Sequence, residues 1–123
     1  MINSGGENIY PDEIEDALVR CPAIDEVIVA GLPHDKWGQA VTAFVIPRAG
    51  VSAQRALADL TEYIRTQSGL SSLARPKRVV VVDRIPKSAV GKVLRREFVS
   101  GNFSALAETA DGPITATTQR ISE

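Results

Sequence analysis

Two runs of β-branched residues, joined by a short connection, constrain the fold of this chain most strongly. The runs span residues 25–32 and 39–46, and Val, Ile and Thr favour the extended backbone of a β-strand. The connection over residues 33–38 is short enough for the two strands to be antiparallel neighbours. We therefore expect an antiparallel strand pair in the first half of the chain.

A third strand and three helices are predicted around this pair. Residues 78–83 are nearly all apolar, which is typical of a strand that is buried on both faces. Helices are expected over residues 11–20, over residues 53–67 after a Ser52 cap, and from residue 93 to about residue 100. The predicted fold class is α+β, with a small, three-stranded, mainly antiparallel sheet flanked by helices.

The ends of the chain differ from this pattern. Residues 3–8 read as a loop, in which Gly5 and Gly6 permit positive φ angles and the close approach of another group. Residues 101–123 are rich in Ala, Thr, Ser and Gly and show little periodicity. We expect one domain over residues 1–100 and a poorly ordered tail over residues 101–123.

The distribution of charge is more informative than its total. The formal net charge is −1, so the total suggests neither a nucleic acid nor an acidic membrane surface as partner. Between residues 75 and 96, however, the charged residues are basic apart from Asp83. This run predicts a local anion-binding surface, although scattered, solvated Lys and Arg side chains would explain it if no motif lay among them.

Cysteine usage and the apolar runs bear on the compartment. The single cysteine, Cys21, permits no internal disulfide and suits a reducing cytosol, where we expect it to be structural. No apolar run approaches the length needed to span a membrane, and the first residues lack the features of a signal peptide. The sequence therefore predicts a soluble, cytoplasmic protein.

A lysine at the join between a loop and a helix is the first candidate for chemistry. The stretch Pro86-Lys87-Ser88-Ala89-Val90-Gly91-Lys92 reads as a loop, and Val-Leu-Arg-Arg-Glu-Phe follows it at helical spacing. Lys92 would thus be carried on a loop with Gly and Ser as hinge residues, which suits a cation that must arrive and leave.

Four segments in register carry a resemblance to a known family. They are the Pro86–Lys92 loop with its helix, residues 4–15 (Ser-Gly-Gly-Glu-Asn-Ile-Tyr-Pro-Asp-Glu-Ile-Glu), residues 37–41 (Trp-Gly-Gln-Ala-Val) and residues 75–77 (Arg-Pro-Lys). Together they resemble the C-terminal domain of the adenylate-forming enzymes, the superfamily of acyl-CoA synthetases, luciferases and peptide-synthetase adenylation domains. The chain departs from the family pattern at Gln39, where Glu is usual, and at Ala74, where Lys is usual.

The resemblance implies a function that two domains share. The Glu7-Asn8 pair favours the acid:CoA ligases, so the implied activity is that of an ATP-dependent, AMP-forming ligase of a fatty or aryl carboxylic acid and CoA. The N-terminal adenylation domain of the same polypeptide would bind ATP with Mg and the acid. This chain would be the C-terminal lid, inactive alone, which closes over that domain in two orientations.

The resemblance also assigns roles to individual residues. Lys92 would be the catalytic cation of adenylation, and Gly6 would line the channel for the CoA thiol. Gly5 is a weaker channel candidate that an ordinary turn explains equally well. Arg75 and Trp37 would contact the CoA nucleotide, although Trp37 fits packing at a turn equally well. Lys92 further resembles family lysines that are targets of protein acetyltransferases, and acetylation would neutralise its charge.

Other polar residues are explained without chemistry. His34 is the only histidine and is expected to shape a turn, so no metal site is predicted. Glu13 and Glu15 lie near a helix N-terminus, where they would compensate the helix dipole. The competing functional class is a free-standing module without catalysis, which would use the basic surface over residues 75–96 to bind a nucleotide or a protein.

Overall fold

The two longest strands are β3 (Ile24–His34) and β4 (Gly38–Pro47), which are antiparallel neighbours. Their register runs from Glu26 opposite Ile46 to His34 opposite Gly38. The strand pair predicted from the two β-branched runs is therefore confirmed. The computed structural model describes residues 1–36, 38–71, 74–85, 87, 95–101 and 103–109.

Two further strands extend the sheet beyond β4. β5 (Arg78–Val82) runs parallel to β4, with Thr42 opposite Arg78 at the start of the ladder. β6 (Ala105–Glu108) is antiparallel to β5. A parallel neighbour requires a crossover between the two strands, and α2 (Ala53–Thr66) lies in this connection.

A small hairpin adds two strands at the other end of the chain. β1 (Ile2–Ser4) and β2 (Glu7–Ile9) pair in antiparallel fashion, and Ser4 is paired with Gly38 at the start of β4. Among the described residues the sheet thus has six strands. The α+β class is confirmed, whereas the prediction of three strands is wrong, because β1, β2 and β6 are too short to produce a periodic pattern.

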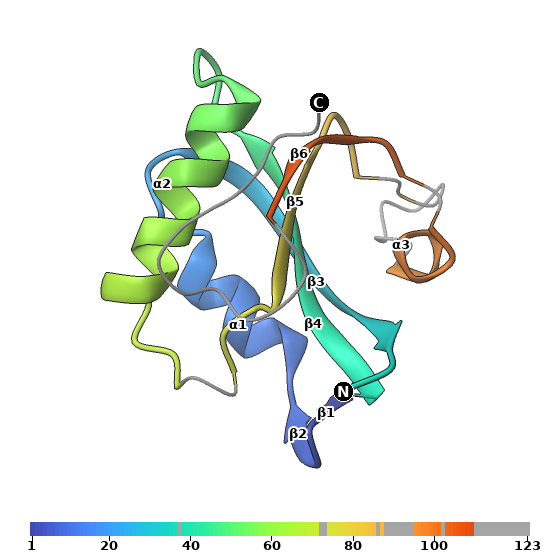
Figure 1. Ribbon diagram of the computed structural model, residues 1–123. Coiled ribbons are helices and arrows are strands. Elements are labelled where there is room, and N and C mark those ends of the chain that lie inside the picture. Colours follow the sequence, from blue (N-terminus) through green and yellow to red (C-terminus); the bar gives the residue numbers. More distant parts are fainter. Residues whose placement is uncertain (37, 72–73, 86, 88–94, 102, 110–123) are drawn as a thin grey trace.

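Helices cover both faces of the sheet. α1 (Pro11–Leu18) and α2 lie on one side, and α3 (Arg95–Val99) lies on the other (Figure 1). Alternate strand residues point to opposite faces, so Val29 packs with the α1 and α2 side, whereas Phe44 packs with Phe98 of α3. The Phe44 and Phe98 rings are stacked with centroids 4.2 Å apart.

The burial of the strands and of α2 agrees with the sequence pattern. Val79 to Val82 on β5 are at most 1 % exposed, as expected for a strand covered on both faces. The Ser52 hydroxyl caps α2 by accepting a hydrogen bond from the Arg55 amide at 3.1 Å. The predicted apolar face of this helix is buried: Ala56, Leu57, Leu60 and Ile64.

The acidic residues of α1 divide into two kinds. Asp12 and Glu13 lie in the first turn, where a negative charge complements the helix dipole. A carboxylate oxygen of Glu15 instead accepts a hydrogen bond from the Val29 amide of β3 at 2.8 Å. The dipole interpretation therefore misses this contact of Glu15, which ties α1 to β3.

The segment predicted to be a poorly ordered tail contributes a strand. β6 lies within it, and the Thr109 hydroxyl next to β6 accepts a hydrogen bond from the Val79 amide at 3.0 Å. The Arg78 guanidinium also forms an ion pair with Glu108. The prediction of poor order from residue 101 onward is therefore wrong for residues 105–108, and residues 110–123 lie outside the described part of the chain.

None of the helices in the described ranges is long and apolar enough to cross a membrane. Cys21 is buried, and burial raises the pKa of its thiol.

Candidate functional site

The turn between β1 and β2 holds Gly5 and Gly6. Gly5 has a φ angle of 60° and Gly6 one of 87°, and side chains with a Cβ disfavour this left-handed region. Both glycines are exposed. A Cβ built at Gly6 would meet no atom within 4 Å, so within this domain the backbone conformation, and not space, requires the glycine.

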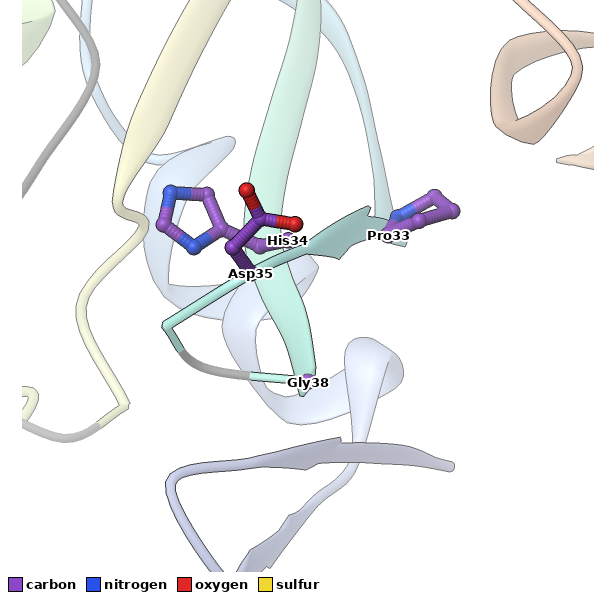
Figure 2. Close-up of a pocket in the computed structure, with 4 residues that line it drawn as sticks. All are labelled: Pro33, His34, Asp35 and Gly38. Carbon is purple, nitrogen blue, oxygen red and sulfur yellow. The ribbon is translucent and has the colours of Figure 1, made fainter.

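The β3–β4 turn lies next to this hairpin. An open pocket of about 470 Å³ is lined by Pro33, His34, Asp35 and Gly38, and Figure 2 shows the His34 ring and the Asp35 carboxylate on the same side of the turn. Nδ1 of His34 accepts a hydrogen bond from the Lys36 amide at 3.0 Å. This bond confirms that His34 shapes the turn. Trp37 lies outside the described residues.

The segment before β5 carries the third candidate. The Arg75 amide donates to the Ser71 carbonyl at 3.0 Å, and Nε of Arg75 donates to the Leu70 carbonyl at 3.3 Å. These bonds fix the stem of the side chain. For the terminal guanidinium nitrogens, no hydrogen bond to another residue in the described ranges is found.

Lys77 follows in the same motif and was not selected from the sequence. Its side chain is only 3 % exposed, its ammonium lies 3.4 Å from the Arg75 carbonyl, and its amide donates to the Val41 carbonyl at 2.7 Å. Burial lowers the pKa of this ammonium. The sequence did offer a signal for the burial of Lys77. This lysine follows Arg-Pro and comes just before a mostly apolar strand, so it lies where the chain enters the core.

The topology brings these segments to one end of the sheet. β4 begins at Gly38, which is paired with Ser4 of the hairpin. Since β5 runs parallel to β4, Arg75, just before β5, lies toward this same end. The glycine turn, the β3–β4 turn and the Arg75 segment therefore gather around the start of β4, although they are far apart in the sequence.

The segment that leads to the candidate lysine begins at the opposite end. Lys87 forms an ion pair with Glu26 at 3.4 Å, and Glu26 is paired with Ile46, close to the end of β4. Lys92 itself lies outside the described residues. The chain thus presents its glycine turn and the beginning of its lysine segment at opposite ends of one sheet.

Three members of the basic run are buried or paired among the described residues. Lys77 is buried, Arg78 is paired with Glu108, and Lys87 is paired with Glu26. The run follows β5 across the sheet, so its charges are distributed from one end to the other. Arg84 and Arg96 of the same run are exposed, so the run contains buried, paired and exposed members. The described residues also contain no group of three or more His, Cys, Asp or Glu side chains suited to hold a metal ion.

The comparison with known sequences agrees with the motifs. A family model for the AMP-binding enzyme C-terminal domain matches residues 13–92. The chain is 42% identical over 120 residues to a 4-chlorobenzoate–CoA ligase from Pseudomonas sp. (strain CBS-3), a match that covers 98% of this chain and 22% of that ligase. The chain thus spans about a fifth of the length of this relative.

Solved structures give the same result. A Mycobacterium tuberculosis fatty acyl CoA synthetase matches with a TM-score of 0.67 and 35% identity, over 82% of this chain and 19% of the other. A double mutant of o-succinylbenzoate CoA synthetase from Bacillus subtilis, bound with its product analogue OSB-NCoA, matches with a TM-score of 0.67 and 38% identity, over 84% and 20% of the two chains. The chain belongs to the family of AMP-binding enzyme C-terminal domains.

Proposed function

We propose that this chain is the C-terminal lid of an AMP-forming ligase that joins a fatty or aryl carboxylic acid to CoA. It would act with an N-terminal adenylation domain of the same polypeptide, which binds the acid and most of ATP with its Mg. The observation that carries the proposal is the placement of the glycine turn and the beginning of the lysine segment at opposite ends of one sheet. A domain with two such ends suits an enzyme that must present each end to the same site in turn.

The first half-reaction is adenylation. An oxygen of the substrate carboxylate attacks the α-phosphorus of ATP, the bond to the bridging oxygen breaks, and pyrophosphate leaves. Negative charge shifts onto the phosphate oxygens as the new bond forms. Lys92 supplies an ammonium that stabilises this charge, and a preorganised donor of this kind is worth about 100- to 1,000-fold in rate.

The second half-reaction transfers the acyl group. The CoA thiol attacks the acyl carbonyl of the adenylate, the bond to the phosphate oxygen breaks, AMP leaves, and the thiol proton is released. Gly5 and Gly6 line the approach of the thiol after the domain has rotated. Arg75 meets the CoA nucleotide with its terminal nitrogens, and Trp37 stacks on the base.

The lysine can be tested in the ligase polypeptide that carries this domain. Lys92→Ala should slow adenylation about 100- to 1,000-fold, while thioester formation from supplied acyl-adenylate stays close to that of the unchanged enzyme. The matched control is Lys87→Ala, which removes a lysine five positions earlier whose partner is Glu26. This control should leave both half-reactions unchanged. Pyrophosphate release and acyl-CoA formation measure the two steps separately, and equal losses in both for Lys92→Ala would contradict the assignment.

The same assay tests regulation by a lysine acetyltransferase. Acetylation of Nζ removes the positive charge, so ligase acetylated at Lys92 should show the loss of adenylation seen for Lys92→Ala. Full adenylation activity in the acetylated enzyme would exclude this form of regulation.

The buried, single Cys21 suits the reducing cytoplasm that we propose as the compartment.

A further inference from the structure

A glycine in the middle of β3 makes an unusually close contact with the β1–β2 hairpin. A Cβ built at Gly31 would lie 2.8 Å from Cγ2 and 3.2 Å from Cγ1 of Ile2, and 3.2 Å from Nε2 of Gln39. Carbon atoms cannot approach to 2.8 Å without displacement. Gly31 is buried and lies within a regular part of the ladder, opposite Val41. Space, and not backbone conformation, therefore requires a glycine here.

The Ile2 side chain that occupies this space anchors the base of the hairpin. Ile2 is 3 % exposed and belongs to the core under α1 and α2. It is paired with Ile9 across the hairpin, and Ile9 belongs to the same core. Any Cβ at Gly31 would push against the branched carbons close to the Ile2 backbone, so Ile2, and with it the base of the hairpin, would be displaced.

Gln39 of β4 makes a second contact that holds β1 in place, in addition to the packing of Ile2 on Gly31. Its Oε1 accepts a hydrogen bond from the Asn3 amide at 2.7 Å, and Asn3 lies between Ile2 and Ser4. The next residue, Ser4, is paired with Gly38. Three consecutive residues of β1 are therefore held by β3 and β4, and the Gly5–Gly6 turn follows at once.

We propose that Gly31 and Gln39 are positioning residues for the Gly5–Gly6 turn. Gly31 sets how closely β1 lies on the sheet, and Gln39 sets its position along the start of β4. Together they fix the direction in which the turn leaves the domain, and hence its aim into the thiol channel. This inference rests on the proposed function, in which that turn acts in thioester formation and not in adenylation.

The first experiment crowds the contact in the ligase polypeptide that carries this domain. Gly31→Ala should lower the rate of thioester formation from supplied acyl-adenylate by about 10- to 100-fold, because a misplacement of about 1 Å has this effect on a positioned group. Adenylation should stay within about twofold, since a different end of the domain serves that step. A similar loss in both half-reactions would overturn the proposal, because it would mean that Gly31 only supports the fold.

A double variant tests whether the contact with Ile2 is the cause. Ile2→Ala removes both carbons that the new Cβ would meet, so Gly31→Ala combined with Ile2→Ala should restore thioester formation to the level of Ile2→Ala alone. If the double variant is as slow as Gly31→Ala, the crowding of Ile2 is not the mechanism and the proposal fails.

The Gln39 tether has its own matched pair. Gln39→Leu removes the acceptor and should slow thioester formation without slowing adenylation. Gln39→Glu keeps an oxygen in the same place and should retain both rates. Equal effects of the two variants on thioester formation would overturn the role of the hydrogen bond.

A readout without catalysis separates this inference from the proposed function. In amide hydrogen exchange of the full polypeptide, the Asn3 amide should be protected in the unchanged protein and in Gln39→Glu, and should exchange faster in Gln39→Leu. If these rates behave as expected but Gly6→Leu leaves thioester formation unchanged, the tether exists and the proposed role of the turn is wrong. If Asn3 exchanges equally fast in all three proteins, the tether itself is refuted.

Discussion

Ser4 and Thr42 are small hydroxyl residues, 1 % and 0 % exposed, whose hydroxyls have different surroundings. The Thr42 hydroxyl donates to the Ala40 carbonyl at 3.0 Å. The Ser4 hydroxyl has no hydrogen-bond partner among the described residues. A buried hydroxyl without a partner costs about 1–3 kcal/mol, whereas a satisfied one contributes about 1 kcal/mol.

This contrast predicts opposite effects of removing the two hydroxyls. Ser4→Ala should raise the free energy of unfolding by about 1 kcal/mol, and Thr42→Val should lower it by a similar amount. Urea unfolding of the 123-residue chain, followed by circular dichroism, measures both values. A decrease for Ser4→Ala as large as that for Thr42→Val would mean that the Ser4 hydroxyl has a stabilising partner.

The glycines show how far single residues could be interpreted from the sequence. Gly5 and Gly6 stand in a recognisable motif, and their positive φ angles agree with the prediction. The role of Gly31 was missed because the β-branched residues around it already predict a strand, and the glycine does not change that prediction. An isolated glycine in a strand does signal a close approach, but the partner, Ile2, is 29 positions earlier, and only the fold brings it near.

At the scale of elements, Glu15 joins α1 to β3. Its carboxylate accepts a hydrogen bond from the Val29 amide. A hydrogen bond to a charged group contributes about 1.5–3 kcal/mol to the free energy of unfolding. Glu15→Ala should therefore lower the free energy of unfolding by about this amount. The control is Glu13→Ala, which changes an exposed residue of the same helix and should cost less than about 1 kcal/mol.

The same unfolding measurement decides between the two explanations of Glu15. Equal, small decreases in the free energy of unfolding for Glu13→Ala and Glu15→Ala would favour helix-dipole compensation for both residues. A clearly larger loss for Glu15→Ala is the result that the hydrogen bond to β3 requires.

Elements with a strong periodic pattern were predicted well, and short ones were not. α2 begins after Ser52 and buries its predicted apolar face because the 3.6-residue period is a local property of its sequence. β1, β2 and β6 have three or four residues each. Strands of this length form only because a neighbour offers a ladder, which local sequence does not encode. The parallel pairing of β4 with β5 likewise depends on the crossover.

At the scale of the whole molecule, the two ends of one sheet carry different motifs. The Gly5–Gly6 turn and Arg75 lie toward the start of β4, and Lys87 leads into the lysine segment near its end. The motifs could be found in the sequence, but their separation could not, because β5 carries the basic run across the sheet. Under the proposed function, this separation would let the domain present a different end in each of the two steps by rotation.

The most direct test measures both half-reactions for Arg75→Ala and Lys92→Ala in the ligase polypeptide. Arg78→Ala is the matched arginine control, because the Arg78 guanidinium already forms an ion pair with Glu108. We expect Arg75→Ala to raise the KM for CoA about 10-fold or more, as for a lost charge-assisted hydrogen bond, and to leave adenylation unchanged. Lys92→Ala should slow adenylation and leave the KM for CoA unchanged. If both variants impair the same half-reaction, the two ends do not serve separate steps, and the central claim is contradicted.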